Sequence, residues 1–544
     1  MRGLRDAAKV RIARLKCRAG LVPAALRDYR NRAGFAIVVT GQTMVVAHPV
    51  AAAEPWRFSA ELSRKIQAVL AAADIDHWSV QPRGTRITQW SVRADDLPAA
   101  REAILAALSG TGHYLKEQGS APVLIDRSVQ GTPPAGDSTM EVFHYTQVGG
   151  QVSSGQAKCQ LVPWQSTERG TLHAANRSAV VQEITDVRPV GTAALTCWDG
   201  SVQPRPEAAG HADASEIDFP VDAVYLWVDD SDPAWRARRD AAYRDYFGQD
   251  RSDGQAKAAI RFRDRGELQA SLRSLEMYAP WIRNVYLVTD QQRPDWLDPD
   301  NTRVTVVDHR DIFADPNNLP TYNSHVLGTQ LHHIPGLSEH YLLMNDDVLF
   351  SQAVSPYDFF TPSGQLKITL SRSRRPLLAG EKLTSLEQAR VNSARLLERD
   401  YGRQVTRLFA HVPVPQSISL ATEISQRYAD EIAQTLSHPF RSADDYVISS
   451  WLCLYTALFT GRGVASELGF AYFDVGSSAA RDRMSSPQRY KNASVICVND
   501  TDTQDTEASS RWLTAWLRRT YPVPTAYELV GDAEAGTSQR LGSG

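Results

Sequence analysis

The residues His340–Phe350, with the sequence His-Tyr-Leu-Leu-Met-Asn-Asp-Asp-Val-Leu-Phe, constrain the fold more than any other stretch of this chain. An apolar run breaks into Asn345, Asp346 and Asp347 and then resumes as Val348–Phe350. A short apolar run indicates a buried strand, in which polar side chains without partners cost several kcal/mol. The pattern predicts either a strand that ends at a metal ion, or a tight turn between two strands, because Asn and Asp favour turns.

Further apolar runs alternate with helical patterns around this stretch. Strands are expected at residues 221–228, 284–289, 304–307 and 495–498, and helices at 266–279, 323–333, 421–436, 446–459 and 511–520. Such alternation predicts an α/β fold with a mostly parallel sheet flanked by helices. In sheets of this kind, ligands bind beyond the carboxyl ends of the strands.

Four successive predicted strands end in aspartates. These are Asp229, Asp290, Asp308 and the pair Asp346 and Asp347. Because the carboxyl ends of parallel strands meet at one edge of the sheet, these side chains would form an acidic rim. A divalent cation relieves the repulsion between such carboxylates, and Mg²⁺ or Mn²⁺, shared with substrate phosphates, is the expected cofactor.

The chain of 544 residues is too long for one ordinary core, so two or three domains are expected. Shifts in composition and linker-like Gly and Pro clusters suggest where the boundaries fall. We predict a basic N-terminal arm at 1–32, a small α+β module at 33–137, a β-rich subdomain at 138–214, a catalytic domain at 215–530 and a disordered tail at 531–544.

Charge and cysteine content bear on partners and location. The net charge of −3 gives no overall basic field, so nucleic acid is not an expected partner. Five scattered cysteines without CxxC spacing fit a reducing cytoplasm. The basic residues of 1–32 fit either a helix resting on the inner face of the plasma membrane or a solvated arm. Gly34–Ala53 fits two short strands, 35–39 and 44–47, better than a signal anchor, because polar residues interrupt it.

Several segments together resemble the Stealth family of sugar-phosphate transferases, over roughly residues 217–500. They are VDAVYLWVDDSDP from Val221, RDRGELQASLRSLEMYAP from Arg263, WIRNVYLVTD from Trp281, LPTYNSHVLGTQLHHIPGLSEHYLLMNDDVLF from Leu319, HPFRSADD from His438 and CVND from Cys497. The family includes bacterial capsular polysaccharide phosphotransferases and the animal N-acetylglucosamine-1-phosphotransferase. The extra N-terminal region resembles the actinobacterial exopolysaccharide phosphotransferase branch.

The resemblance implies a fold of the nucleotide-sugar transferase type, GT-A or Rossmann-like, together with a reaction and its partners. A nucleotide-sugar donor, such as UDP-GlcNAc or another UDP-hexose, would give its hexose-1-phosphate to a hydroxyl of a glycan acceptor. A phosphodiester would form in a capsular or exopolysaccharide, and nucleoside monophosphate would leave. A metal-dependent glycosyltransferase that attacks the anomeric carbon needs the same cation and donor, so the residues alone do not separate the two. A non-catalytic glycan-binding protein is a third reading, and a homo-oligomer is compatible with the sequence.

Residue roles are also implied by the resemblance. The expected metal ligands are Asp229, Asp347 and Asp500. The expected substrate-binding residues are Trp227, Asp232, Asn323, Ser324, Asn345, Asp346 and Asn499. The expected catalytic residues are His325, His411 and Arg441: one of the histidines would take the proton of the acceptor hydroxyl, and the arginine would brace the phosphoryl group. Structural readings stay open, in which Arg441 pairs with Asp444 or Asp445, Trp227 is core and Asp232 starts a turn.

Overall fold

The computed structural model describes residues 11, 13–17, 20–81, 88–126, 138–148, 151–153, 158–174, 181–191, 193–196, 202–248, 262–374, 383–499 and 507–529. The chain falls into two compact units, Met1–Glu216 and Ile217–Gly544. Residues 1–10, 12, 18 and 19 of the predicted N-terminal arm and all of the predicted tail lie outside the described residues.

The N-terminal unit is built on one large sheet, with eleven strands among the described residues. Its main path is β1 (Ala36–Thr40), β2 (Thr43–Pro49), β7 (Met140–Val148), β9 (Lys158–Ser166), β10 (Thr171–Ala174) and β11 (Glu183–Thr185). The shorter members are β3 (His77–Trp78), β4 (Thr88–Arg93), β5 (His113–Glu117), β6 (Val123–Leu124) and β8 (Gln151–Ser153). Since β7 pairs with both β2 and β5, strands from residues 33–137 and 138–214 share this sheet.

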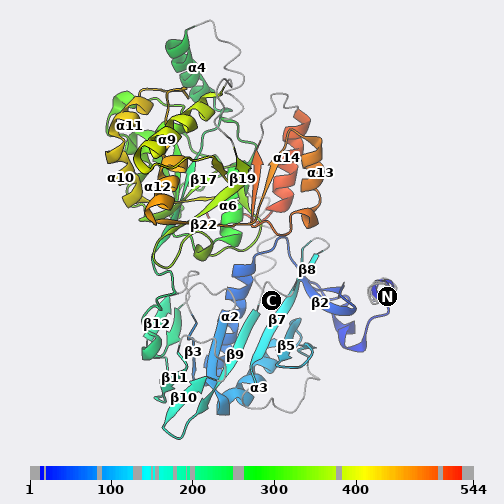
Figure 1. Ribbon diagram of the computed structural model, residues 1–544. Coiled ribbons are helices and arrows are strands. Elements are labelled where there is room, and N and C mark those ends of the chain that lie inside the picture. The colour runs from blue at the N-terminus through cyan, green and yellow to red at the C-terminus, as the bar shows by residue number, and fades with distance from the viewer. Residues whose placement is uncertain are drawn as a thin grey trace. The chain divides into compact units, whose positions relative to one another are not determined.

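Two amphipathic helices cover this sheet, α2 (Pro55–Ala72) and α3 (Leu97–Leu108) (Figure 1). Leu62, Ile66 and Leu70, spaced by four residues on α2, are buried in one cluster with strand residues such as Leu161. A separate ribbon pairs β12 (Ala193–Thr196) with β13 (Val202–Arg205). The predicted pair of short strands near residues 35–47 is confirmed as the antiparallel hairpin β1–β2, in which Ala36 faces Ala47. Among the helices that the structure describes, none has the length and apolar character needed to span a membrane.

The C-terminal unit is organised around a five-stranded sheet. Its order is β16 (Val304–Asp308), β15 (Val285–Thr289), β14 (Val221–Leu226), β17 (His340–Asn345) and β21 (Val414–Ser417). The first four strands are parallel, and β21 is an antiparallel edge strand. The predicted α/β class with a mostly parallel sheet is therefore confirmed.

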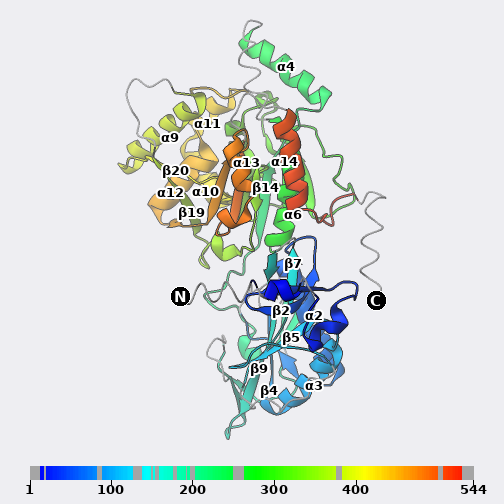
Figure 2. The ribbon, with the colours of Figure 1, turned by 90° about the vertical axis from the view of Figure 1, so that its right-hand side faces the viewer.

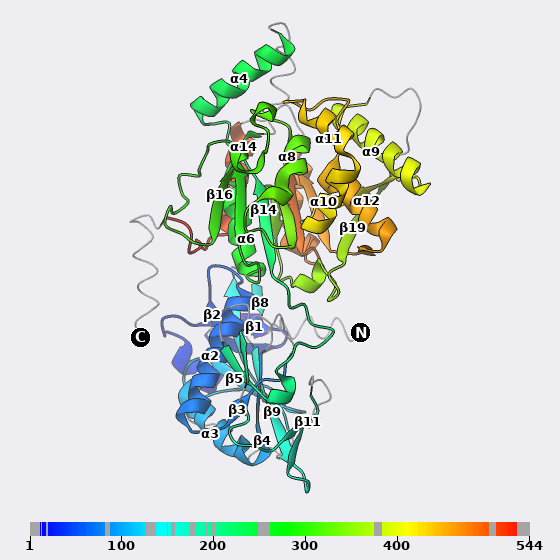
Figure 3. The ribbon, with the colours of Figure 1, turned by 90° about the vertical axis from the view of Figure 1, so that its left-hand side faces the viewer.

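Helices flank this sheet on both faces (Figures 1, 2 and 3). Helix α8 (Ser324–Gln330) packs on one face of the sheet, where its Val326 lies in a buried cluster with Val224 of β14 and Val288 of β15. Successive side chains of a strand point to opposite faces, and these two valines point toward α8. The same side carries α9 (Ser385–Tyr401), α10 (Ile418–Arg427), α11 (Ala429–Leu436) and α12 (Cys453–Thr460). On the opposite side, α6 (Glu267–Tyr278) hydrogen-bonds its Ser271 to Tyr225, and α13 (Ser478–Met484) and α14 (Glu507–Thr520) lie beyond it.

Smaller elements complete the unit. One three-stranded sheet has the order β18 (Val348–Phe350), β24 (Val495–Asn499) and β23 (Phe470–Asp474), and another has β20 (Arg407–Phe409), β19 (Leu366–Arg374) and β22 (Gly463–Ser466). The helices α4 (Pro233–Phe247) and α7 (His309–Ile312) follow β14 and β16.

The structure of the stretch His340–Phe350 agrees with the expected strand end and turn, whereas two of the expected helices differ from the prediction. Asp346 and Asp347 form a turn at the end of β17, which is both the strand end and the turn that the sequence allowed, and the chain passes there into a second sheet. The single helix expected at 421–436 is divided into α10 and α11 at Tyr428, whose ψ of 39° leaves the helical range. The helix expected at 446–459 begins as a π-turn at Ile448–Leu452.

Candidate active site

The ends of the parallel strands bring the predicted aspartates to one edge of the sheet. Leu226 of β14 is level with Val288 of β15 and with Asn345 of β17, and Thr289 is level with Asp308. Each acidic residue therefore follows its strand at the same edge, as the sequence predicted.

Two members of this rim already have cationic partners. Asp290 accepts a hydrogen bond from Arg238 (Nη2–Oδ2, 3.1 Å). Asp308 caps α7 and pairs with Arg310 at 2.7 Å, and these hydrogen bonds lower its pKa although partial burial opposes the shift. A cation is thus better placed at the half of the edge formed by β14 and β17 than at the half formed by β15 and β16.

In the turn after β17, one carboxylate oxygen lacks a hydrogen-bond partner among the described residues. Asp346 accepts a hydrogen bond from the backbone N–H of Asp347, and Asp347 accepts one at its Oδ2 from Cys497 Sγ (3.5 Å). The Oδ1 atom of Asp347 is buried and has no hydrogen-bond partner among the described residues. Burial raises the pKa of Asp347, and that of Asp346 is raised well above its ordinary value by burial and by the charge of Asp347. A divalent cation would relieve both effects.

Asp264 is a site residue that the sequence reasoning missed. It lies just before α6, accepts the indole Nε1–H of Trp227 at 2.8 Å and accepts the backbone N–H of Gly266 at 2.7 Å. Burial raises its pKa, and the charge of Asp229 raises it further. Its own charge acts on Asp346, so Asp264 connects the end of β14 to the turn after β17. The signal available in the sequence was its position in the segment Arg263-Asp264-Arg265-Gly266, directly before a predicted helix.

The first acidic loop is held by local hydrogen bonds. The carboxylate of Asp229 accepts the backbone N–H of Ser231 at 2.8 Å and its hydroxyl at 2.6 Å. Asp232 is the N-cap of α4, accepting the N–H of Ala234 at 2.8 Å, and also accepts Gln292 Nε2 at 3.1 Å. Asp232 therefore has the structural role that a turn-starting Asp suggests. Its role in donor binding, like that of Asp229 in metal binding, stays a prediction.

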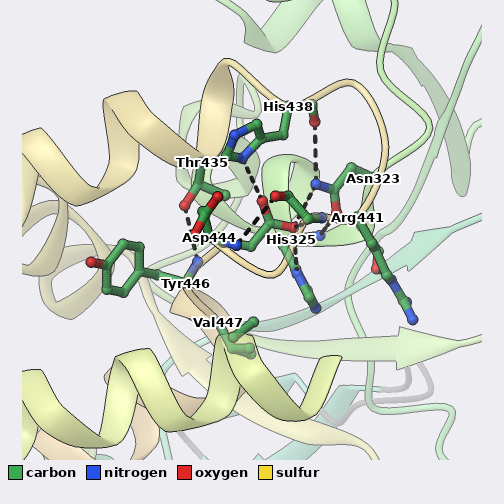
Figure 4. A network of polar contacts seen from close by, with 12 residues as sticks. Asn323, His325, Thr435, His438, Arg441, Asp444, Tyr446 and Val447 are labelled. Carbon is green, nitrogen blue, oxygen red and sulfur yellow. Dashed lines mark hydrogen bonds and ion pairs between the residues drawn. The ribbon is translucent and has the colours of Figure 1, made fainter. Parts of the chain in front are cut away.

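A second polar cluster is centred on Asp445, whose side chain has no exposed surface. Figure 4 shows His325, His438 and Asn323 converging on one point. His325 Nδ1 and Asn323 Nδ2 lie 3.0 and 2.9 Å from Asp445 Oδ2, and His438 Nδ1 lies 2.8 Å from Oδ1. The backbone N–H of Ser442 donates to Oδ2 at 3.0 Å. Burial would raise the pKa of Asp445, but the hydrogen bonds from His325, Asn323 and Ser442 lower it below its ordinary value.

The Asn-Ser-His element supplies three different contacts to this cluster. Asn323 caps α8, its Oδ1 accepting the N–H of His325 at 3.0 Å. Ser324 Oγ accepts a hydrogen bond from Arg441 Nη2 at 2.7 Å. The predicted neighbours Asn323, Ser324, His325 and Arg441 are therefore brought together, although more than a hundred residues separate Ser324 from Arg441. Sequence reasoning did not assign Asp445 and His438 to the site.

His411 belongs to the carboxylate side of the site. Its ring lies 5.3 Å from that of Tyr472, and the charge of Asp347 acts on it. Burial lowers the pKa of His411 and also that of His325, and the positive charge of Arg390 lowers both. Arg390 itself lies over the ring of Trp451 at 5.7 Å. The charge of Arg390 therefore acts on one histidine of each cluster.

The remaining predicted residues are less constrained. Asn345 is exposed at the end of β17, and Asn499 ends β24 and hydrogen-bonds to Tyr472. Asp500 lies outside the described residues. Across the described ranges, no group of three His, Cys, Asp or Glu side chains has an arrangement that could hold a metal ion. The unpartnered oxygen of Asp347 has the chemistry of a metal ligand. The roles of Asp229, Asp347 and Asp500 as metal ligands stay predictions.

Comparisons with known proteins identify the family of this chain. Three regions of the chain match Stealth protein conserved regions: region 1 at residues 219–246, region 2 at 261–368 and region 3 at 410–458. The exopolysaccharide phosphotransferase SCO6023 of Streptomyces coelicolor is 35% identical over 80% of this chain and 72% of its own length. The chain belongs to the Stealth family.

Two further relatives extend the match. Exopolysaccharide phosphotransferase SCO2594 of Streptomyces coelicolor is 33% identical over 91% of this chain and 88% of its own length. Exopolysaccharide phosphotransferase CpsY of Mycobacterium tuberculosis is 36% identical over 58% of this chain and 59% of its own. Stealth proteins are transferases, so this chain is an enzyme of that class. The predicted site residues from Trp227 to Arg441 lie within the three Stealth regions, whereas Asn499 and Asp500 lie beyond them.

Proposed function

We propose that this protein is a sugar-phosphate transferase of exopolysaccharide synthesis. It transfers hexose-1-phosphate from a UDP-hexose, such as UDP-GlcNAc, to a glycan hydroxyl, forming a phosphodiester and releasing UMP. The observation that carries the proposal is the presence in the C-terminal unit of two unlike clusters, an acidic turn at Asp346 and Asp347 and a buried Asp445 that holds His325, with Arg441 on the neighbouring Ser324. The acidic turn suits a cation that binds the donor diphosphate. The Asp445 cluster suits removal of a proton from an acceptor hydroxyl.

The donor would bind at the acidic side. Mg²⁺ or Mn²⁺, held by Asp347 with Asp229 and Asp500, would supply positive charge to the donor diphosphate and to the leaving nucleotide. Asp347 fits this role because its Oδ1 has no partner among the described residues and because its pKa is raised by burial. Trp227, whose indole N–H is fixed by Asp264, would line the nucleotide end.

The acceptor would bind at the histidine side. His325 is the proposed base, because its Nδ1 is tied to Asp445 and its Nε2 makes no hydrogen bond within the described part of the chain. Burial lowers its pKa, so the ring is neutral and able to take a proton at pH 7. Arg441, anchored on Ser324, would brace the transferred phosphoryl group, since a guanidinium matches phosphate oxygens in pairs.

Product analysis tests this function. The purified protein is incubated with a panel of UDP-hexoses, Mn²⁺ or Mg²⁺ and glycan primers, and the released nucleotide and the glycan are examined. We expect UMP and a ³¹P NMR signal of a phosphodiester in the glycan. Asp347→Asn and His325→Gln should each abolish most turnover, whereas Asp308→Asn, at the other half of the acidic edge, should not. Release of UDP with a phosphorus-free glycan would instead identify attack at the anomeric carbon.

Two further aspects of the proposal concern the environment of the enzyme. The arm at residues 1–32 carries ten basic residues against two acidic ones, and Leu15 and Leu21 are exposed to 57% and 65%. These features support contact with an anionic membrane surface. Binding of the full chain to phosphatidylglycerol vesicles, lost at high salt, would test it. A homo-oligomer stays a prediction, which sedimentation of the full chain would test.

A further inference from the structure

We infer that Asp445 is a positioning residue that fixes the tautomer of two histidines at once, and that His438 belongs to the same proton-handling unit as His325. The inference deepens the proposed function and rests on it for the identity of the reaction. It rests on geometry alone for the hydrogen-bond arrangement, which can be measured without any turnover.

The tautomers of His325 and His438 follow from the hydrogen-bonding chemistry of the Asp445 carboxylate. An ionised carboxylate only accepts hydrogen bonds. His325 Nδ1 and His438 Nδ1 lie 3.0 and 2.8 Å from the two oxygens of Asp445, so each Nδ1 must carry its hydrogen. In a neutral imidazole the lone pair is then on Nε2. Asp445 is ionised at neutral pH, because the hydrogen bonds it accepts lower its pKa. Both rings therefore present Nε2 as a proton acceptor.

Besides the two histidines, donors from two segments of the chain hold the carboxylate of Asp445. Asn323 Nδ2 donates to Asp445 and also to the carbonyl oxygen of His438, at 2.9 and 3.2 Å. The backbone N–H of Ser442 donates to the same carboxylate at 3.0 Å. These donors come from the start of α8 and from the loop after α11, so the carboxylate joins two segments that are distant in sequence. The arrangement leaves Asp445 no freedom to turn away when His325 becomes charged.

Each partner of Asp445 has a distinct consequence for the reaction. When His325 Nε2 accepts the proton of the acceptor hydroxyl, the imidazolium formed keeps its Nδ1–H on Asp445, whose negative charge stabilises it. No second proton transfer is required, because the leaving nucleotide departs as a phosphate. His438 contributes by holding the other oxygen of Asp445, so that Oδ2 stays directed at His325.

Asp445→Asn is the decisive variant. Asn has nearly the shape of Asp, but its amide group can donate to a ring nitrogen, which lets His325 carry its hydrogen on Nε2 and removes the base. We expect kcat to fall by about 10²–10⁴-fold, with the KM for the UDP-hexose changed less than about threefold. Asp444→Asn is the matched control, because Asp444 is exposed and its backbone N–H, rather than its carboxylate, bonds to Ser442 Oγ. It should leave kcat unchanged.

Histidine ¹⁵N NMR gives a readout that does not depend on activity. In the wild-type chain at pH 7.5, with His325→Gln and His438→Gln used for assignment, both rings should show a protonated Nδ1 and an unprotonated Nε2. In Asp445→Asn the pattern of His325 should reverse. A protonated Nε2 on His325 in the wild-type protein would overturn the inference even if the variant does not fold. So would full activity of Asp445→Asn. The inferred tautomers in a chain that makes no phosphodiester would support the inference and refute only the proposed reaction.

Discussion

Replacing Asp347 by Asn should make the metal-free protein more stable while it removes activity. The Oδ1 atom of Asp347 is buried without a hydrogen-bond partner in the described structure, and the neighbouring Asp346 adds a like charge. An unsatisfied buried polar atom costs about 1–3 kcal/mol, and a charged one costs more. Asn removes the charge and keeps the shape. Its amide oxygen can still accept from Cys497 Sγ, and its uncharged NH2 takes the place of Oδ1, so the gain comes from the loss of the buried charge. We therefore expect a gain of about 1–3 kcal/mol in the free energy of unfolding at pH 7.

The pH dependence of this gain follows from the direction of the pKa shift. Because the pKa of Asp347 is raised in the folded state, its proton stabilises the fold at low pH, and that stability is lost as pH rises through the folded-state pKa. The advantage of Asp347→Asn should be present at pH 7 and shrink as pH falls toward about 4, the ordinary pKa of an aspartate. Differential scanning calorimetry in EDTA at several pH values measures this, and each kcal/mol corresponds to about 2–4 °C in a domain of moderate size.

Metal addition supplies the second half of the test. A cation at 100 times its Kd stabilises the folded state by about 2.7 kcal/mol, so Mn²⁺ should raise the Tm of the wild-type protein and not that of Asp347→Asn. Asp308→Asn is the control, since Asp308 is paired with Arg310 and should show no gain in EDTA and a normal response to Mn²⁺. The reasoning is refuted if Asp347→Asn is less stable than the wild-type protein in EDTA, or if Mn²⁺ raises the Tm of both equally.

Three further predictions concern other parts of the C-terminal unit. Since burial lowers the pKa of His325, log kcat should begin to fall only below about pH 6.5, and a midpoint well above that value would contradict its role as the base. Arg441→Lys should lower kcat by about tenfold or more, exceeding the effect of Ser324→Ala, because Lys cannot contact phosphate oxygens in pairs; equal effects in steady-state assays would contradict this. Glu528→Gln should cost about 3–5 kcal/mol of stability in urea unfolding, since it leaves the partly buried Arg273 without its carboxylate; a change below about 1 kcal/mol would contradict it.

The sheet could be predicted from the sequence because its signals are local. Short apolar runs, each leading to an Asp, predicted β14 to β17 and placed their acidic ends at one edge. The same reasoning could not tell which of these carboxylates would be paired with an arginine. Arg238 and Arg310 neutralise Asp290 and Asp308, and those pairings depend on how α4 and α7 are directed after their strands.

The polar hub around Asp445 could not be predicted for a related reason. Asn323 and Asp445 are 122 residues apart, and no spacing rule reports that their side chains meet. The sequence placed Asp445 only as one of two alternative partners for Arg441, whereas Asp445 binds two histidines and Arg441 hydrogen-bonds to Ser324. Asp264 was missed for the same reason: it is 37 residues from Trp227 in the chain, and the two side chains meet only in the folded protein.

The phosphorus atom that remains with the transferred sugar tests the central claim most directly. UDP-GlcNAc or the accepted UDP-hexose, labelled with ³²P at the β-phosphate, is incubated with the enzyme, Mn²⁺ and a glycan primer, and the polymer is separated from nucleotides. The account predicts that the label enters the polymer in a 1:1 ratio with the hexose and that unlabelled UMP is released. Transfer of the hexose with the label left in UDP would contradict it.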